Sequence, residues 1–424
     1  MPQPEPTEPL FICDLTQSYA PHGGGGISTY LREKRDYLRE NTPHRHIQIV
    51  PGPETKVVED GRHVWVEIEA PPVPESENYR FILKTKPVHE VLAKYRPDII
   101  ESLCPWLLPW TAINHRKTYP ETALVAGYRT DFPNAHVYRV GREKLGERLA
   151  RGARWLTYGY AEMTYREFDW VYTLGEANKA TLDRCNIERT SILPLGVDTT
   201  LFHPNKADPG YAAELGLDGD GPLLVYAGRI DNEKRANRVT EMMEELDPSL
   251  GAKLVMLGHG KLKDELEARM KALGLQVAFP GFVQEREDMA RALASADLYV
   301  SGMADETFGI SIIEAQAAGL PVIGVASGAM PARVPEGAGI GYLGPVDDPP
   351  AMARLVEKAW AEDTPAMSAR ARAHVVERYG WDRTFERLLG EIYPRALAFA
   401  KARQGLPRRR WPEVSDLPAL TAAA

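Results

Sequence analysis

Short apolar segments alternate with amphipathic helical stretches through the second half of the chain, and this alternation constrains the fold more than any other feature. The apolar segments lie at 223–227, 253–257, 277–283, 297–301, 322–325 and 340–343. Strands that alternate with helices predict a parallel sheet covered by helices on both faces. Gly319 and Pro321 support the prediction, because they end a helical stretch directly before the segment 322–325.

The first half of the chain shows the same units less regularly. Its apolar segments lie at 10–15, 46–50, 98–102, 123–127, 169–174 and 190–193. A chain of 424 residues is too long to fold around a single hydrophobic core, so we expect two α/β domains. Two domains imply a cleft. The segment 194–211 is rich in turn residues and suits an interdomain linker.

These signals predict a doubly wound α/β protein made of two Rossmann-like domains. The expected boundaries are an N-terminal domain over 1–195, a C-terminal domain over 196–378, a helix over 379–404 and a tail over 405–424. Pro394 lies inside the last helix, and we expect it to kink or break that helix because proline lacks an N–H donor.

Composition excludes several classes of protein. The net charge of -8 argues against a protein that coats nucleic acid, which needs clustered cations. Cys13, Cys104 and Cys185 lack the spacing of a metal site or a disulfide framework, which favours a reducing cytoplasm. The chain opens without a signal-like segment and contains no membrane-length apolar run, so we expect a cytoplasmic protein without a membrane span.

Chemistry in an open parallel sheet is expected beyond the carboxyl ends of its strands. Glu306 follows the apolar segment 297–301, and Glu314 is predicted about two turns into the next helix. The residues expected to start that helix are Thr307, Phe308, Gly309, Ile310 and Ser311. Their backbone amides suit a diphosphate. Alternatively, Glu306 caps the helix and Glu314 lies on its solvated face.

Two cations and a histidine are expected at the same edge of the sheet. Arg229 and Lys234 follow the segment 223–227, where they would neutralise a diphosphate leaving group. His259 lies between Gly258 and Gly260 after the segment 253–257, and the glycines would let the backbone approach a nucleotide. The alternatives are ordinary surface cations and a plain turn.

Four glycines, Gly23 to Gly26, separate the first predicted strand from the first helix. They would present amides to phosphate, although the loop has neither the GxGxxG spacing nor a Walker lysine. A plain flexible loop is the alternative. Asp218-Gly-Asp220 matches the sequence pattern of a metal-binding DxD motif. It precedes a predicted strand instead of following one, so we interpret it as a turn.

Together these motifs resemble the retaining glycosyltransferases of family 4, which have the two-domain GT-B architecture. The most specific part is the E-x7-E string from Glu306 to Glu314, continued by Gly319-Leu-Pro321-Val322. Gly228-Arg229 with Lys234 is similar to the diphosphate-binding pair of the family, and 194–198 is similar to its P-x-G-V-D segment. The resemblance covers nearly the whole chain.

The resemblance implies roles for these residues. Glu314 would hold the donor ribose, and residues near Val283 the base. Glu306 and the amides of Phe308 to Ile310 would hold the sugar and phosphates. The loop at Gly25 and Gly26 would close on the donor. Arg229 and Lys234 would replace a metal, so neither a metal nor another cofactor is expected.

One position departs from the family pattern. Many relatives have His-Thr-Asp or His-Thr-Asn after the strand at 123–127, whereas this chain has Arg129-Thr130-Asp131. Arg129 would either clamp an acidic sugar or a phosphate or only pair with Asp131, and we include both among the candidate catalytic residues. His136 is a nearby alternative or a plain surface histidine.

The reaction implied is transfer of a hexose, with retention, from a nucleoside-diphosphate sugar to a hydroxyl of a lipid or saccharide. A UDP-sugar is favoured, and GDP-mannose is the other donor considered. A same-fold epimerase, a sugar phosphorylase and a non-catalytic descendant are the alternatives; a Rossmann oxidoreductase lacks its fingerprint here. The basic stretches 138–154 and 401–411 suggest peripheral contact with anionic lipid at the inner face of a membrane, or solvated helix faces.

Overall fold

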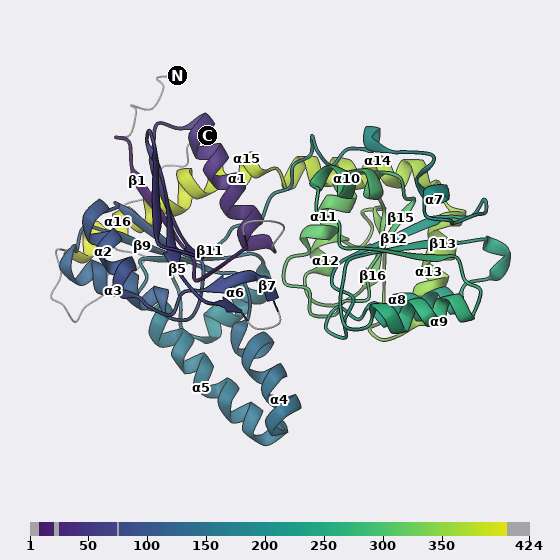
Figure 1. Ribbon diagram of the computed structural model, residues 1–424, viewed down its shortest axis with the longest axis horizontal. Coiled ribbons are helices and arrows are strands. Elements are labelled where there is room, and N and C mark those ends of the chain that lie inside the picture. The colour runs from purple at the N-terminus through teal and green to yellow at the C-terminus, as the bar shows by residue number, and fades with distance from the viewer. Residues whose placement is uncertain (1–7, 21–24, 74–75, 405–424) are drawn as a thin grey trace. The chain divides into compact units, whose positions relative to one another are not determined.

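The computed structural model describes residues 8–20, 25–73 and 76–404, which divide into two compact units (Figure 1). The N-terminal unit contains Met1–Pro194 together with Thr384–Ala424, and the C-terminal unit contains Leu195–Arg383. The last helices of the chain therefore belong to the N-terminal unit. Each unit has its own sheet and its own buried apolar core.

The C-terminal unit is built on a six-stranded parallel sheet with the order β14-β13-β12-β15-β16-β17. The strands are β12 (Leu223–Ala227), β13 (Lys253–Leu257), β14 (Val277–Gly281), β15 (Leu298–Val300), β16 (Val322–Val325) and β17 (Gly341–Gly344). All six predicted strands are present. The chain steps outward from β12 to β14 in one direction and from β15 to β17 in the other, so the strand order reverses between β12 and β15. Such a reversal is where open α/β sheets bind ligands.

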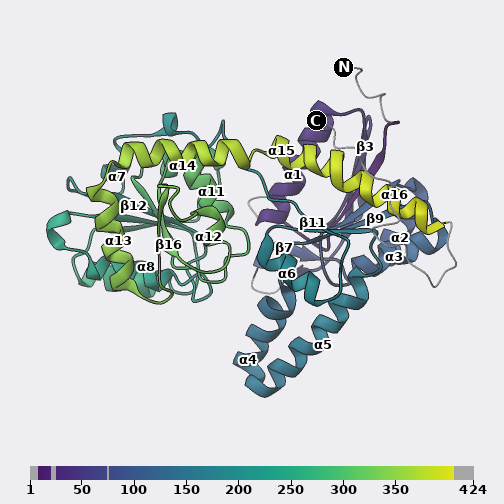
Figure 2. The ribbon, with the colours of Figure 1, turned by 180° about the vertical axis from the view of Figure 1, so that it is seen from behind.

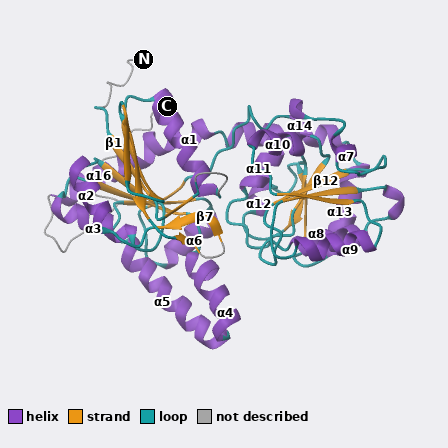
Figure 3. Ribbon diagram, in the orientation of Figure 1, coloured by secondary structure: helices purple, strands orange, loops and turns teal. Residues whose placement is uncertain are grey.

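Helices cover both faces of this sheet, as predicted (Figure 3). One face carries α8 (Ala236–Glu245), α9 (Lys263–Ala272) and α13 (Pro349–Ala361), and the other carries α10 (Arg286–Ala294), α11 (Ile310–Ala317) and α14 (Thr364–Arg378). The shorter helices are α7 (Tyr211–Glu214) and α12 (Met330–Arg333). Residues 219–221 form a bend before β12, in agreement with the predicted turn at Asp218–Asp220.

The N-terminal unit is built on an eight-stranded sheet with the order β11-β10-β9-β8-β1-β3-β5-β4. The strands are β1 (Phe11–Leu15), β3 (Arg45–Gly52), β4 (Lys56–Asp60), β5 (His63–Glu69), β8 (Ile99–Ser102), β9 (Ala123–Tyr128), β10 (Trp170–Thr173) and β11 (Thr190–Ile192). All are parallel to their neighbours except β4, which forms a hairpin with β5. The sequence analysis missed that hairpin and a small sheet of β2 (Ser18–Tyr19), β6 (Pro72–Val73) and β7 (Ser76–Phe81).

The helices of the N-terminal unit connect these strands. They are α1 (Gly26–Asn41), α2 (Lys86–Tyr95), α3 (Leu108–Thr118), α4 (Arg139–Leu145), α5 (Glu147–Tyr165) and α6 (Glu176–Arg184). Near the end of the chain, α15 (Trp381–Arg387) leads through π-helical Leu388–Ile392 into α16 (Tyr393–Gln404) (Figure 2). The helical path thus continues past Pro394, and the wider π turn before it accommodates the missing N–H. No helix in the described ranges is long and apolar enough to cross a membrane.

A buried ionic network ties the last helix to the N-terminal sheet. The ammonium of Lys34, on α1, contacts the carboxylate of Asp14 and lies 2.7 Å from Glu101 Oε2. Lys34 Nζ donates to Tyr393 Oη at 2.6 Å, and Tyr393 Oη donates to Glu101 Oε2 at 2.5 Å. Burial alone would raise the pKa of Asp14, but Lys34 and His46 hold that pKa well below its usual value. This network was not predicted from the sequence.

Candidate active site

Glu306 lies in the loop between β15 and α11, at the predicted carboxyl edge of the C-terminal sheet. Its Oε1 accepts hydrogen bonds from the amides of Thr307 and Gly309, each at 3.1 Å, and from the amide of Phe308 at 3.5 Å. Gly309 has a φ of 81°, a conformation that glycine adopts without strain. Thr307 to Gly309 therefore belong to the loop, and α11 begins only at Ile310.

This geometry modifies the predicted role of the amides. We expected the amides after Glu306 to be open to a diphosphate, but three of them face the Glu306 carboxylate itself. Glu306 does not cap the helix either, because α11 begins at Ile310 with Gly309 as its N-cap, and the three amides belong to the loop before it. A carboxylate held there shows that this cluster of amides accepts an anionic oxygen.

Lys234 approaches Glu306 from the neighbouring strand. It follows β12, and its Nζ lies 3.3 Å from Glu306 Oε2. Both side chains are partly exposed, Lys234 at 27% and Glu306 at 13%. Because β12 and β15 are adjacent and the strand order reverses between them, this ion pair marks the switch point of the sheet.

Arg229 follows β12 as predicted, but two acids of its own loop engage it. Its guanidinium lies 2.6 Å from Asp231 Oδ2 and 2.5 Å from Glu233 Oε2. Burial acts to lower the pKa of Arg229, but the hydrogen bond and charge of Glu233, with the charge of Asp231, raise that pKa overall. A phosphate at this edge would have to compete with those carboxylates for the guanidinium.

Glu314 lies one turn into α11, since the helix starts later than predicted. Its Oε1 is 3.4 Å from the guanidinium of Arg286, at the start of α10. Glu314 is mostly buried, so the alternative that it lies on a solvated helix face is wrong. The sequence analysis did not single out Arg286. Val283, in the loop before Arg286, is half-buried.

The glycines around His259 serve the packing of the sheet. A Cβ added to Gly258 would lie 1.9 Å from the carbonyl oxygen of Gly228, and one added to Gly260 would lie 2.2 Å from that of Ile230. The two loops therefore touch backbone to backbone, which explains both glycines without a ligand. The side chain of His259 is exposed at the same edge.

Arg333, which was not among the predicted site residues, supports the loop that carries Glu306 through its contacts with Phe308. Its Nε donates to the carbonyl of Phe308 at 2.7 Å, and its guanidinium stacks on the Phe308 ring at 4.0 Å. Nη1 donates to Tyr379 Oη at 2.8 Å. Burial lowers the pKa of Arg333. These contacts fix the loop that carries Glu306.

The N-terminal unit carries the remaining candidates. Arg129 is buried and stacks on the Tyr30 ring at 4.3 Å, and both of its terminal nitrogens lack a hydrogen-bond partner within the described residues. Asp131 accepts hydrogen bonds from Tyr128 and Tyr158 instead. The alternative that these two residues simply pair is therefore not supported. His136 is exposed.

The glycine loop is only partly described. Gly25 precedes α1, and its amide donates to Tyr79 Oη at 2.9 Å. Gly26 is the first residue of α1. Gly23 and Gly24 lie outside the described residues, as does most of the basic stretch 401–411.

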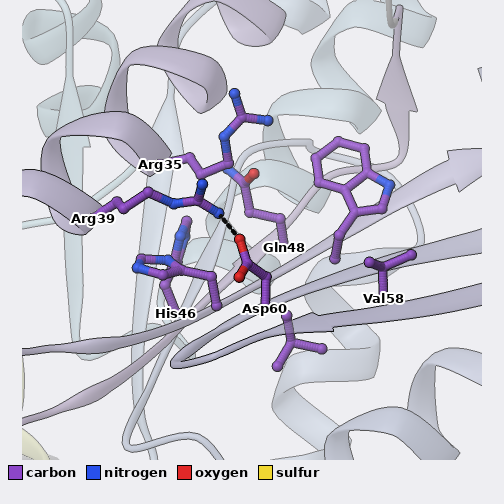
Figure 4. Close-up of a pocket in the computed structure, with 9 residues that line it drawn as sticks. Arg35, Arg39, His46, Gln48, Val58 and Asp60 are labelled. Atoms are coloured by element: carbon purple, nitrogen blue, oxygen red, sulfur yellow. Dashed lines mark hydrogen bonds and ion pairs between the residues drawn. The ribbon is translucent and has the colours of Figure 1, made fainter.

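A separate pocket of about 240 Å³ lies in the N-terminal unit between α1 and the strands β3, β4 and β5 (Figure 4). Arg39 points toward Asp60 there, and the dashed line in Figure 4 marks their ion pair, whose N–O distance is 2.6 Å. The remaining lining residues are Arg35, His46, Gln48, Val58, His63, Val64 and Trp65. None of the predicted site residues is among them.

Two family profiles together match most of the chain. The profile described as Glycosyltransferase Family 4 matches residues 24–201, and the one described as Glycosyl transferases group 1 matches residues 210–375. The chain belongs to the family 4 glycosyltransferases. The two Rossmann-like units are those of its GT-B fold, and the resemblance seen in the sequence is confirmed.

Several named relatives are similar to this glycosyltransferase. The GDP-mannose-dependent alpha-(1-6)-phosphatidylinositol dimannoside mannosyltransferase of Mycobacterium tuberculosis is 29% identical over 74% of this chain and 78% of its own length. The D-inositol 3-phosphate glycosyltransferase of Streptomyces griseus is 33% identical over 50% of this chain and 48% of its own length. These names, like the profiles, are those of glycosyltransferases.

Solved structures show the same fold. Sucrose-phosphate synthase from Thermosynechococcus elongatus superposes with a TM-score of 0.70 at 20% identity, covering 92% of this chain and all of that one. Anabaena HepE in complex with UDP superposes with a TM-score of 0.69 at 17% identity, covering 91% of this chain and all of that one. The glycosyltransferase has no group of three or more histidine, cysteine or acidic side chains placed to hold a metal within the residues described.

Proposed function

We propose that the enzyme transfers a hexose, with retention of anomeric configuration, from a nucleoside-diphosphate sugar to a hydroxyl of a lipid or saccharide. The observation that carries the proposal is the Lys234–Glu306 pair at the switch point of the C-terminal sheet. Arg229 and His259 follow the neighbouring strands at the same edge, and Glu314 lies on the helix behind it. This arrangement provides cations for a diphosphate and carboxylates for sugar and ribose hydroxyls.

Charge stabilisation at this edge would provide the catalysis. As the bond between the anomeric carbon and the diphosphate breaks, negative charge develops on the leaving phosphate, and Lys234 and Arg229 stabilise that charge in place of a metal. Glu306 holds Lys234 in position and accepts a hydrogen bond from a sugar hydroxyl. When the donor binds, Arg229 exchanges its ion pair with Asp231 or Glu233 for one with the phosphates. Positioning of the acceptor hydroxyl supplies the rest of the rate enhancement.

Retention follows from the family resemblance. In that scheme the departing phosphate takes the proton of the acceptor hydroxyl, and the new bond forms on the face that the phosphate leaves. No carboxylate then serves as a covalent nucleophile, and Glu306 acts by positioning. The anomeric configuration of the product reports directly on this part of the proposal.

For the donor, we propose GDP-mannose. The sequence alone favoured a UDP-sugar, but the relative that matches 74% of the chain at 29% identity is named for GDP-mannose. A Corynebacterium glutamicum relative, 25% identical over 76% of the chain, is also named for it. The UDP-bound HepE structure is only 17% identical and supports the fold alone.

For the acceptor, we propose a lipid or saccharide that carries an anionic group. The relatives named above act, by name, on phosphatidylinositol dimannoside and on inositol 3-phosphate. Arg129, with two buried nitrogens that lack partners in the described residues, is the side chain we assign to that anion, because the guanidinium fork fits phosphate and carboxylate oxygens.

The test is a donor screen with purified enzyme and a phosphoinositide acceptor. We expect GDP release from GDP-mannose that depends on the acceptor, little UDP release from UDP-glucose, and a product whose anomeric proton shows the donor configuration by NMR. Lys271→Met, an exposed lysine of the same unit, serves as the matched control for Lys234→Met. Epimerised donor without transfer, or equal activity of both variants, would refute the proposal.

A further inference from the structure

Helices α4 and α5 form a hairpin that extends away from the sheet of the N-terminal unit (Figures 1 and 2). Gly146 joins them with a φ of 81°. The C-terminal end of α5 anchors the hairpin, since Ala161 and Tyr165 are buried there. Tyr160 Oη also donates to the carbonyl of Trp106 at 2.5 Å. The remainder of α5, toward its N-terminus, projects beyond the core.

The outer face of α5 is apolar and exposed. Leu149, Leu156 and Met163 recur every seven residues, so they form one stripe along the helix, and their exposed fractions are 65%, 66% and 53%. Trp155 beside them is 75% exposed. Single exposed apolar residues are ordinary, but a continuous stripe of this size marks an interaction surface.

Basic side chains surround this stripe. The segment 138–154 holds six arginines and lysines against two glutamates, in a chain whose net charge is -8. Arg142, Lys144 and Arg148 are exposed on the hairpin. Arg148 lies about two turns before Trp155 on α5 and next to Leu149 in the sequence, so a cation lies beside the apolar stripe. The surface thus combines a tryptophan, leucines and an excess of positive charge.

We propose that this outer face of the α4–α5 hairpin docks on an anionic lipid surface. Trp155 and the stripe of Leu149, Leu156 and Met163 enter the boundary between headgroups and acyl chains, while the cations contact lipid phosphates. A second copy of the chain fits less well, because pairing two such faces would bring like charges together. This docking requires no sugar donor and is independent of the proposed transfer reaction.

The test is cosedimentation of the full chain with vesicles, without donor or acceptor. We expect binding to vesicles that mix phosphatidylcholine with phosphatidylglycerol, and at least tenfold weaker binding to phosphatidylcholine alone or in high salt. The double variant Trp155→Ala with Leu156→Gln should lose at least tenfold in binding. Leu273→Gln, which changes a leucine that is 53% exposed in the other unit, should bind like the unaltered chain.

Several results would overturn the docking surface. They are absence of binding at low salt, equal binding to neutral vesicles, and unchanged binding by the double variant. Self-association that the double variant abolishes, without vesicle binding by the unaltered chain, would identify a second copy as the occupant and refute the lipid assignment. Circular dichroism of each variant verifies that the fold is retained, which these exposed positions should permit.

Discussion

Lys234 Nζ lies 3.3 Å from Glu306 Oε2, across 72 residues of sequence. The contact joins the loops that follow β12 and β15, the two strands between which the order of the C-terminal sheet reverses. Glu306 also holds three backbone amides just before α11. One carboxylate therefore organises both a cation and the loop that leads into α11, at the edge where family members are expected to bind the donor.

Glu306→Gln should reduce transfer at least a hundredfold, because the amide keeps a carbonyl acceptor for the backbone amides but loses the charge that holds Lys234. The free energy of unfolding should change by less than about 1 kcal/mol, as expected for a partly exposed ion pair. Initial rates and chemical denaturation check the two expectations. Near-normal rates would remove Glu306 from the site.

Arg129→Met should lower kcat/KM at least tenfold while leaving the free energy of unfolding unchanged or higher. Methionine preserves the packing against Tyr30, and the substitution removes buried donors that lack partners among the described residues, whose desolvation costs free energy. Transfer assays and denaturant titration distinguish the roles. A stability loss with unchanged transfer would show that Arg129 is structural.

Lys34→Met should destabilise the protein by about 3–5 kcal/mol, because it leaves the buried carboxylates of Asp14 and Glu101 without their cation. Denaturant unfolding measures the change. Lys94→Met, at a largely exposed lysine, is the control and should cost less than about 0.5 kcal/mol. A loss below about 1 kcal/mol for Lys34→Met would contradict the importance of the network.

Stability should fall as the pH drops from about 6.5 toward 4. Burial lowers the pKa of His63 to about 4, with His46 and Arg39 adding to the shift. The unfolded chain therefore takes up the proton at a pH where the folded protein does not. His63→Phe should reduce the loss between about pH 6.5 and pH 5 by up to about 1.5 kcal/mol. Identical pH profiles for the two proteins would contradict the shifted pKa.

The positions of the strands were accessible from the sequence because periodicity and turn residues are local signals. All twelve predicted strands are present in the structure. The β4–β5 hairpin was missed although its two-residue turn, Gly61-Arg62, begins with a glycine at a φ of 60°, which is typical of a hairpin turn.

Side-chain partners were accessible only where they are close in sequence. The acids that engage Arg229 lie two and four residues away, so a local charge pattern could have revealed them. Lys34 and Glu101 are 67 residues apart, and Arg333 reaches Phe308 across 25 residues. Such contacts depend on how strands and helices pack, which one sequence without homologues does not specify.

The most direct test of the donor site is calorimetric titration of GDP into the unaltered protein, into Lys234→Met and into Lys271→Met. We predict that Lys234→Met weakens GDP binding at least tenfold, because the diphosphate loses a charge-assisted contact, and that Lys271→Met binds as the unaltered protein does. Equal affinity of all three proteins for GDP would contradict the placement of the donor diphosphate beside Lys234 and Glu306.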